Sequence, residues 1–470
     1  MAPRSYNILD KDLDRVSNAE RAGVISQRSI ARIGGAILFV AIATLIWVSF
    51  SDGSTMIWIL IAGVAVAAYL AIAIGANDVA NSLGPAVGAG AISMTTGLFL
   101  LAIMQVAGAV IGGADVTDRL ADGIVLPVFS DHGGLSARMM IAALLAAAIW
   151  ISIATWAEAP ISTTHSIVGA IVGAGVATFG WHAVDWSSLL QIAAGWIISP
   201  IISGFVAAGL LAFYRATIHT KDDRVSAALI WLPWIAAASA FLFIANLLYE
   251  FLKFDLLSST LVAIGAAVFS AFYIRHHVKQ DIARSPNPRE AVKAALGLPL
   301  VVATLIMGFA HGSNDAANIT APLSIILNVS NSTGLPALWP ALLAGLGIAC
   351  GAVLFGRKLV HMIGSKITRL NTTRAFCVTL ATAATVIAAS GIGLPVSTTH
   401  VAVGGVFGVG FYREWIDMRQ HRNRESLPAE ERQRRHLVRR SHFRTILGAW
   451  LITVPCSGLL AWLCSTLLTY

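Results

Sequence analysis

The chain has 470 residues, of which 57% are hydrophobic and only 12% are charged, and its formal net charge is +8. A soluble globular domain carries about 25% charged residues. This composition therefore excludes a large soluble core and predicts an all-α protein that crosses a membrane many times. The excess Lys and Arg lies in short segments between apolar runs, which indicates membrane orientation and argues against nucleic acid as a partner.

The chain begins with a polar segment of mixed charge, residues 1–32, which we expect to be a cytoplasmic tail. The apolar run at 33–51 lacks a small-residue cleavage site, so a retained transmembrane helix at 33–55 is predicted and not a signal peptide. The four cysteines have no metal-ligand spacing and are expected to be small apolar side chains. Further apolar spans, near the roughly 20 residues that cross a bilayer, lie at 56–74, 97–114, 137–158, 163–180, 187–213, 228–249, 257–274, 295–310, 337–356, 375–391, 396–412 and 445–468.

Charge predicts how these spans are oriented. Lys and Arg are in excess at 1–32, 275–293, 356–374 and 413–444, which are therefore expected in the cytoplasm. The segment 115–131 has four Asp and one Arg and is expected on the opposite side. We expect the Arg-rich segment to lie near anionic lipid headgroups. A compact chain without an organelle signal favours a bacterial inner membrane.

Two polar motifs each occur twice. "GANDVANS" begins at Gly75 and "HGSNDAANI" at His311, while "APISTTHSIVGAIVGAG" begins at Ala159 and "LPVSTTHVAVGGVFGVG" at Leu394. The polar segment after the first Asn-Asp motif is acidic and the one after the second is basic, so the two halves are expected to face opposite ways. This pattern is typical of an inverted-repeat secondary transporter with broken helices near the membrane midplane. We assign the first repeat to 56–214 and the second repeat to 295–470. The connecting helices between them lie at 215–294.

The Asn-Asp motifs place a carboxylate within each apolar half. An ionised Asp at the centre of a membrane helix costs at least about 2.5–3.5 kcal/mol, so Asp78 and Asp315 need partners. Neither motif contains Lys or Arg, and the expected partner is a bound Na⁺ or a proton. Helix capping by Asn and Asp is the alternative. The expected cation ligands also include Asn77, Asn81, Asn314 and Asn318, with helix breaks expected at Gly75, Gly84, Pro85, Gly312 and Pro322.

The STTH motifs cluster hydroxyl groups at the expected start of a helix. Free N–H groups and the helix dipole favour an anion there, so we predict that an oxyanion binds Ser162, Thr163, Thr164, Ser397, Thr398 and Thr399. Hydroxyl-to-backbone bonds within a membrane helix are the alternative. His165 and His400 could orient hydroxyls, relay protons or satisfy a buried polar position. His311 has no counterpart in the first copy, which argues against an obligatory role.

These motifs closely resemble the inorganic phosphate transporter (PiT) family, whose doubled signature is Gly-x-Asn-Asp-x-x-Asn. The resemblance extends from about residue 57 to the C-terminus through "GANDVANSLGPAVGAG", "FAHGSNDAAN" and "SGIGLPVSTTHVAVGGVFGVG". It implies phosphate uptake coupled to Na⁺ or H⁺, with the anion site between two inverted halves. It also implies about 12 family helices, which makes the helix at 33–51 an additional one.

Two features depart from the family pattern. Animal members carry a glutamate on the helix after each Asn-Asp motif, where this chain has Gln105 and Thr379. Glu158, just before Pro160, is an acid that those members lack, and it is a candidate carrier of a coupling proton. The coupling ion therefore stays open between Na⁺ and H⁺.

The leading hypothesis is cation-coupled phosphate symport by alternating access, without enzymatic activity or a cofactor. A sulfate permease on the same scaffold is the closest alternative, since sulfate differs mainly in lacking an O–H at neutral pH. An intramembrane aspartyl protease is a remote alternative, because it needs two carboxylates side by side. Stoichiometry, resting conformation and assembly as a homo-oligomer are left open by the sequence.

Overall fold

The structure is a computed structural model, and it describes residues 30–50, 57–126, 133–159, 161–285, 287–329, 338–362, 371–421 and 440–469. Within these ranges the fold is helical, apart from an isolated antiparallel bridge between Val125 and Val184. Ten helices in the described ranges are long and apolar enough to cross a bilayer, and two shorter apolar helices accompany them. The prediction of an all-helical protein that spans a membrane many times is confirmed.

The helices follow the predicted spans. The helix Ile30–Ser49 comes first, and the first half continues with α2 (Ile57–Gly88), α3 (Met94–Gly112), α4 (Ala114–Gly123), α6 (Gly134–Trp156), α7 (Thr163–Phe179), η1 (Trp181–Ala183) and α8 (Trp186–Tyr214). The connecting region contains η2 (Arg215–His219), α9 (Arg224–Asn246), η3 (Leu247–Phe251), α10 (Leu256–Arg284) and α11 (Pro288–Ala295). The second half contains α12 (Gly297–Asp315), α13 (Ala317–Val329), α14 (Trp339–Phe355), α15 (Arg357–Met362), α16 (Thr372–Gly391), α17 (Thr398–His421) and α19 (Arg440–Thr469). The division of the chain into a tail, an additional helix, two repeats and a connecting region stays a prediction.

Polar residues begin several of these helices. Asp185 accepts hydrogen bonds from the backbone N–H groups of Ser187 and Ser188 at the start of α8. The hydrogen bonds from Ser188 hold the pKa of the Asp185 carboxyl below its usual range. Asp255 caps α10 in the same manner. Carboxylates are favoured at these positions because the first N–H groups of a helix have no partner within it.

Glycines bring helices of the two halves into backbone contact. A side chain at Gly75 of α2 would meet the carbonyl of Ile348 in α14, and one at Gly351 of α14 would meet the carbonyl of Ile72. The equivalent pair of helices, α12 and α3, repeats this arrangement at Gly312 and Gly108. Small residues allow this close packing, which replaces the hydrophobic driving force that membranes lack.

The STTH helices also pack across the halves. Gly169 and Gly173 place α7 of the first half against α19 of the second, and Gly404 and Gly408 place α17 against α8. In both cases the glycines are four residues apart and so lie on one helix face. The helix pairs α2–α14 with α12–α3, and α7–α19 with α17–α8, are therefore reciprocal. Such a reciprocal pattern is expected of two inverted repeats.

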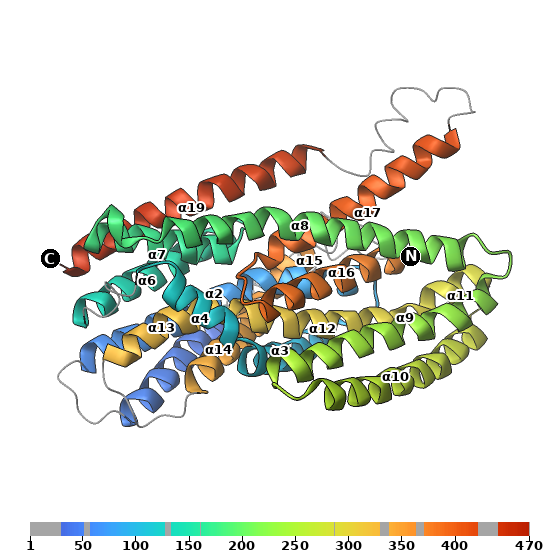
Figure 1. The fold of residues 1–470 in the computed structure, drawn as a ribbon, viewed down its shortest axis with the longest axis horizontal. Coiled ribbons are helices and arrows are strands. Elements are labelled where there is room, and N and C mark those ends of the chain that lie inside the picture. Colours follow the sequence, from blue (N-terminus) through green and yellow to red (C-terminus); the bar gives the residue numbers. More distant parts are fainter. Residues whose placement is uncertain are drawn as a thin grey trace, which may run out of the picture.

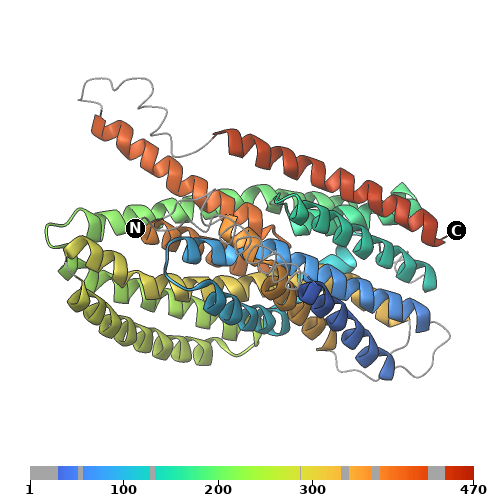
Figure 2. The same ribbon diagram turned by 180° about the vertical axis from the view of Figure 1, so that it is seen from behind.

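The connecting helices lie at the edge of this bundle. Figures 1 and 2 show α9 and α10 side by side at one edge, with α7 and α19 toward the opposite edge. Large apolar side chains such as Phe269 and Leu261 of α10 are exposed, as lipid contact requires. Most of the N-terminal tail and most of the Arg-rich segment lie outside the described residues. In the described part of that segment, the guanidinium carbon of Arg419 lies 4.1 Å from the ring centre of Trp415.

Two local predictions differ from the structure. The helix breaks expected at Gly75, Gly84 and Pro85 were wrong, because α2 runs through all three residues. Gly75 is needed for contact with α14, and Pro85 lies in the last turn, where it removes only one hydrogen bond. The acidic segment 115–131 lies between predicted spans and was therefore expected as a loop, but it begins within the amphipathic helix α4.

The breaks expected at Gly312 and Pro322 were also wrong, because Gly312 lies within α12 and Pro322 lies within α13. Only Ala316 separates these two helices, and its backbone is in the right-handed helical region with φ of −59° and ψ of −33°. Non-helical segments precede Thr163 and Thr398. The N-termini of α7 and α17 therefore bring free N–H groups to the STTH motifs.

Candidate functional site

The two aspartates lie together in the interior, and each accepts a hydrogen bond from the STTH motif of its own half. Asp78 also accepts one from Thr399 of the other half, at 3.2 Å. Asp78 of α2 and Asp315 of α12 are fully buried. The Thr163 hydroxyl donates to Oδ2 of Asp78 at 2.7 Å, and the Thr398 hydroxyl donates to Oδ2 of Asp315 at 3.3 Å. The four motifs, far apart in the sequence, thus meet at one place.

The asparagines connect the motifs further. Asn81 Nδ2 donates to Thr399 Oγ1 at 2.8 Å and to Asp78 Oδ1 at 3.1 Å, so it contacts the STTH motif of the other half. Asn318 Nδ2 donates to Thr164 at 3.5 Å in the equivalent manner. The other two asparagines contact the helices that precede the STTH helices in the chain. Asn77 donates to Thr155 of α6 at 2.9 Å, and the Asn314 amide lies 3.1 Å from the Ser390 hydroxyl of α16.

The remaining hydroxyls hold the two STTH motifs against each other. Thr164 donates to the carbonyl of Val396 at 3.1 Å, and Thr399 donates to the carbonyl of Ile161 at 3.2 Å. Both threonines therefore make hydroxyl-to-backbone hydrogen bonds, as the alternative interpretation of the STTH motifs predicted. These bonds join the two halves and do not lie within one helix.

The serines of the motifs begin the STTH helices. Ser162 Oγ accepts the N–H of His165 at 3.1 Å, and Ser397 Oγ accepts the N–H of His400 at 3.3 Å. Each serine side chain is used here as an acceptor, so its O–H hydrogen can still be donated. Ser162 and Ser397 are both buried beside the threonines that contact the aspartates.

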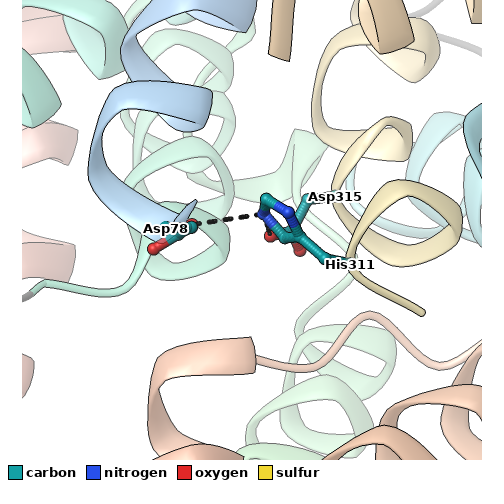
Figure 3. A group of neighbouring side chains, drawn as sticks. All are labelled: Asp78, His311 and Asp315. Atoms are coloured by element: carbon teal, nitrogen blue, oxygen red, sulfur yellow. Dashed lines mark ion pairs between the residues drawn. The ribbon is translucent and has the colours of Figure 1, made fainter. Parts of the chain in front are cut away.

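His311 is the residue whose importance the sequence pattern did not reveal. Its Nε2 lies 2.8 Å from Oδ2 of Asp315 and 4.0 Å from Oδ2 of Asp78, between the two carboxylates (Figure 3). Its Nδ1 lies 2.8 Å from Nε2 of Gln105. Asp78, His311 and Asp315 each offer one atom within 4.8 Å of the others, so together they could hold a cation. The four-residue spacing of His311 and Asp315 on one helix was the signal for this contact.

The other candidates lie in several different surroundings. His165 and His400 stack on each other with ring centres 4.4 Å apart. Gln105 contacts His311, and Thr379 is buried on α16. Glu158 is in a different environment: it is partly exposed and lies 2.7 Å from Nζ of Lys358. It adopts a positive φ of 56° between α6 and α7.

Comparison with known proteins identifies the family. A sequence profile of the phosphate transporter family matches residues 74–461. The chain belongs to the phosphate transporter family. This membership confirms the resemblance that the motifs predicted, and it agrees with the expectation of a transporter and not an enzyme. The family match argues against the intramembrane protease alternative, although the structure does bring the two carboxylates close together.

Relatives support the same assignment over most of their length. A protein of Helicobacter pylori named as a phosphate permease is 36% identical over 415 residues, which cover 86% of this chain and 78% of the relative. One of Thermococcus kodakarensis with the same kind of name is 34% identical and covers 86% and 96%. A solved structure described as the sodium-dependent phosphate transporter matches with a TM-score of 0.79 at 30% identity, covering 87% of this chain and 98% of that one.

Proposed function

We propose that this protein carries inorganic phosphate across a bacterial inner membrane together with Na⁺ or H⁺, by alternating access between two inverted halves. One observation carries the proposal: carboxylates and hydroxyls from both halves converge on a single buried site. The family and the relatives named as phosphate permeases support phosphate as the substrate. A cytoplasmic N-terminus follows from the distribution of Lys and Arg.

Charge balance is the reason for a coupling cation. Two ionised aspartates and a phosphate close together repel one another strongly, since two unit charges at 4 Å interact by about 4 kcal/mol even at an effective dielectric constant of 20. A cation at Asp78 and Asp315 offsets this repulsion. The side-chain oxygens that surround the aspartates suit Na⁺, and the likeness to a sodium-dependent phosphate transporter supports Na⁺. A proton on one carboxylate serves the same purpose.

The threonine hydroxyls link cation binding to phosphate binding. Thr163 and Thr398 donate to the same carboxylates that are proposed to hold the cation. A cation that occupies those oxygens competes with the hydroxyl groups. The released O–H groups can then donate to phosphate, together with Ser162 and Ser397. Cation binding is therefore expected to increase the affinity for phosphate.

Phosphate suits the site better than sulfate does. Phosphate at neutral pH carries an O–H group that needs an acceptor, whereas sulfate carries none. The anion-binding hydroxyls lie in direct contact with Asp78 and Asp315. A carboxylate oxygen that the cation leaves free can accept the phosphate O–H, and it disfavours an oxyanion that has nothing to donate.

Uptake of radiolabelled phosphate into proteoliposomes tests the proposal, with the Na⁺ and pH gradients imposed separately. Accumulation should follow one of the two gradients and should not be displaced by excess sulfate. Asp78→Asn and Asp315→Asn should abolish gradient-driven accumulation. Asp255→Asn, which changes an exposed cap of α10, is the matched control. Normal uptake by both site variants, or equal uptake without any gradient, would refute the proposal.

A further inference from the structure

Four aromatic rings contact one another in a continuous row behind the STTH motifs, which we call the stack, although Trp196 meets His165 edge-on and the other two pairs are tilted. The ring of Trp196 lies 3.8 Å from that of His165, His165 lies 4.4 Å from His400, and His400 lies 3.4 Å from Trp450, measured between ring centres. The two tryptophans come from α8 and α19, and the two histidines come from α7 and α17. The stack therefore passes through four helices and both halves of the chain.

The stack is attached directly to the hydroxyl motifs. His165 follows Thr164 and His400 follows Thr399, so movement of either ring moves the first turn of an STTH helix. Trp196 also donates from Nε1 to the carbonyl of Pro395 at 3.2 Å. Trp196 thus contacts the histidine of the first motif and the backbone that precedes the second.

Close helix packing surrounds the stack. The glycine contacts of α7 with α19 and of α17 with α8 bring the helix of each histidine against the helix of the tryptophan that contacts the other histidine. His165 and His400 are 5% and 2% exposed. Within the described residues, His165 Nδ1 and His400 Nε2 have no hydrogen-bond partner. Ring packing is therefore the main contact of these two side chains.

We propose that Trp196, His165, His400 and Trp450 position the two STTH motifs as one phosphate-binding unit, so that a change at either end of the stack weakens binding by both motifs. The inference rests on the proposed function, because it concerns the same hydroxyl groups. It assigns a positioning role to His165 and His400, for which the sequence left three roles open. It also adds Trp196 and Trp450, which no sequence motif indicated.

Kinetics of phosphate uptake by tryptophan variants test the positioning role. Trp196→Leu and Trp450→Leu are each expected to raise KM for phosphate about tenfold and to leave the maximal rate within about twofold. Trp196→Phe and Trp450→Phe keep a ring and should restore most of the affinity. Trp231→Leu is the matched control, since Trp231 packs on Phe213 outside the stack and should leave KM unchanged.

The double variant asks whether the stack acts as one unit. If it does, Trp196→Leu with Trp450→Leu raises KM by no more than about twofold over either single variant, because coupled residues are not additive. Effects that multiply show two independent contacts and overturn the proposal. Unchanged KM in both single variants also overturns it. Absence of cation-dependent uptake by the unaltered protein would instead refute the proposed function.

Histidine variants distinguish a packing role from a proton-relay role. They also test the proposal if Trp196→Leu and Trp450→Leu fail to fold. His165→Phe retains a ring without nitrogen, and His165→Leu removes the ring. Positioning by packing predicts that His165→Phe keeps KM near its original value and that His165→Leu raises it. Equal loss of activity in both variants, with both proteins inserted and monodisperse, shows that the nitrogen is required and overturns the proposal.

Discussion

Thr163 and Thr398 are the residues that connect the proposed cation and anion sites. Each hydroxyl donates to a buried carboxylate, and each stands in the first turn of a helix whose N-terminus favours an anion. Hydrogen bonds to charged groups contribute about 1.5–3 kcal/mol. The free energy of such a hydrogen bond is large enough that the choice of acceptor, carboxylate or phosphate, can control the affinity for phosphate.

Replacing Thr163 by Val removes this hydroxyl with little change of shape. We expect Thr163→Val to raise Kd for phosphate about tenfold or more, and to weaken the dependence of Kd on the coupling cation, since about 1.4 kcal/mol corresponds to a factor of ten. Thr163→Ser keeps the hydroxyl and should behave like the unaltered protein. Phosphate binding measured by calorimetry at low and high Na⁺ checks both effects. An unchanged Na⁺ dependence in Thr163→Val would contradict the proposed link.

Gln105 should matter through its contact with His311. Gln105→Leu leaves Nδ1 of a fully buried imidazole without its partner, and an unpaired buried polar group costs about 1–3 kcal/mol. We expect a lower unfolding temperature in detergent and reduced uptake. Gln105→Glu can still contact Nδ1 and should retain more activity. A stable, fully active Gln105→Leu variant would show that the contact is dispensable.

Helix contacts in this protein depend on glycine to a degree that hydrophobicity alone does not reveal. The pairs α2–α14 and α3–α12 approach so closely that a Cβ at the contact point meets a backbone carbonyl. These pairs carry Asp78 and Asp315, so the separation of the carboxylates depends on glycines that lie outside the site itself.

Gly351 tests this dependence without altering the site. Gly351→Ala introduces a methyl group against the carbonyl of Ile72, and overpacking typically costs about 1–3 kcal/mol. The thermal unfolding midpoint should fall, and uptake should fall with it. Gly265→Ala on α10 has nothing within 4 Å, so it should leave both unchanged. Equal midpoints for the two variants would mean that α2 and α14 can separate at no cost.

The whole molecule separates a buried polar centre from a charged periphery. Asp78, His311 and Asp315 lie in the interior, whereas Glu158 pairs with Lys358 where both are partly exposed. Surface ion pairs contribute about 0–1 kcal/mol. This position favours a peripheral contact between the halves over a coupling role for Glu158.

Neutralising Glu158 should therefore have little effect on coupling. We expect Glu158→Gln to retain uptake within about twofold under a Na⁺ gradient and under a pH gradient, because a contact of that size changes rates only modestly. Asp315→Asn, assayed in parallel, should lose uptake. If Glu158→Gln lost only the uptake driven by the pH gradient, Glu158 would be the carrier of the coupling proton.

The sequence by itself determined the membrane class, the helical spans, the doubled motifs and the family. These follow from local composition and from repeated residue types, which leave a direct record in one dimension. Only the tertiary structure decided that α2 continues through Gly75, because the reason is contact with Ile348, a residue far away in the chain.

The same limit applies to the site. The sequence identified Asp78, Asp315 and the STTH residues, but not that Asn81 contacts Thr399 of the opposite half. The repeat pattern assigned His311 no obligatory role because this residue is not repeated, although the packing of α12 near α2 places its ring between both aspartates. A pattern reports which side chains are polar, whereas the packing of α2 against the other half decides which of them meet.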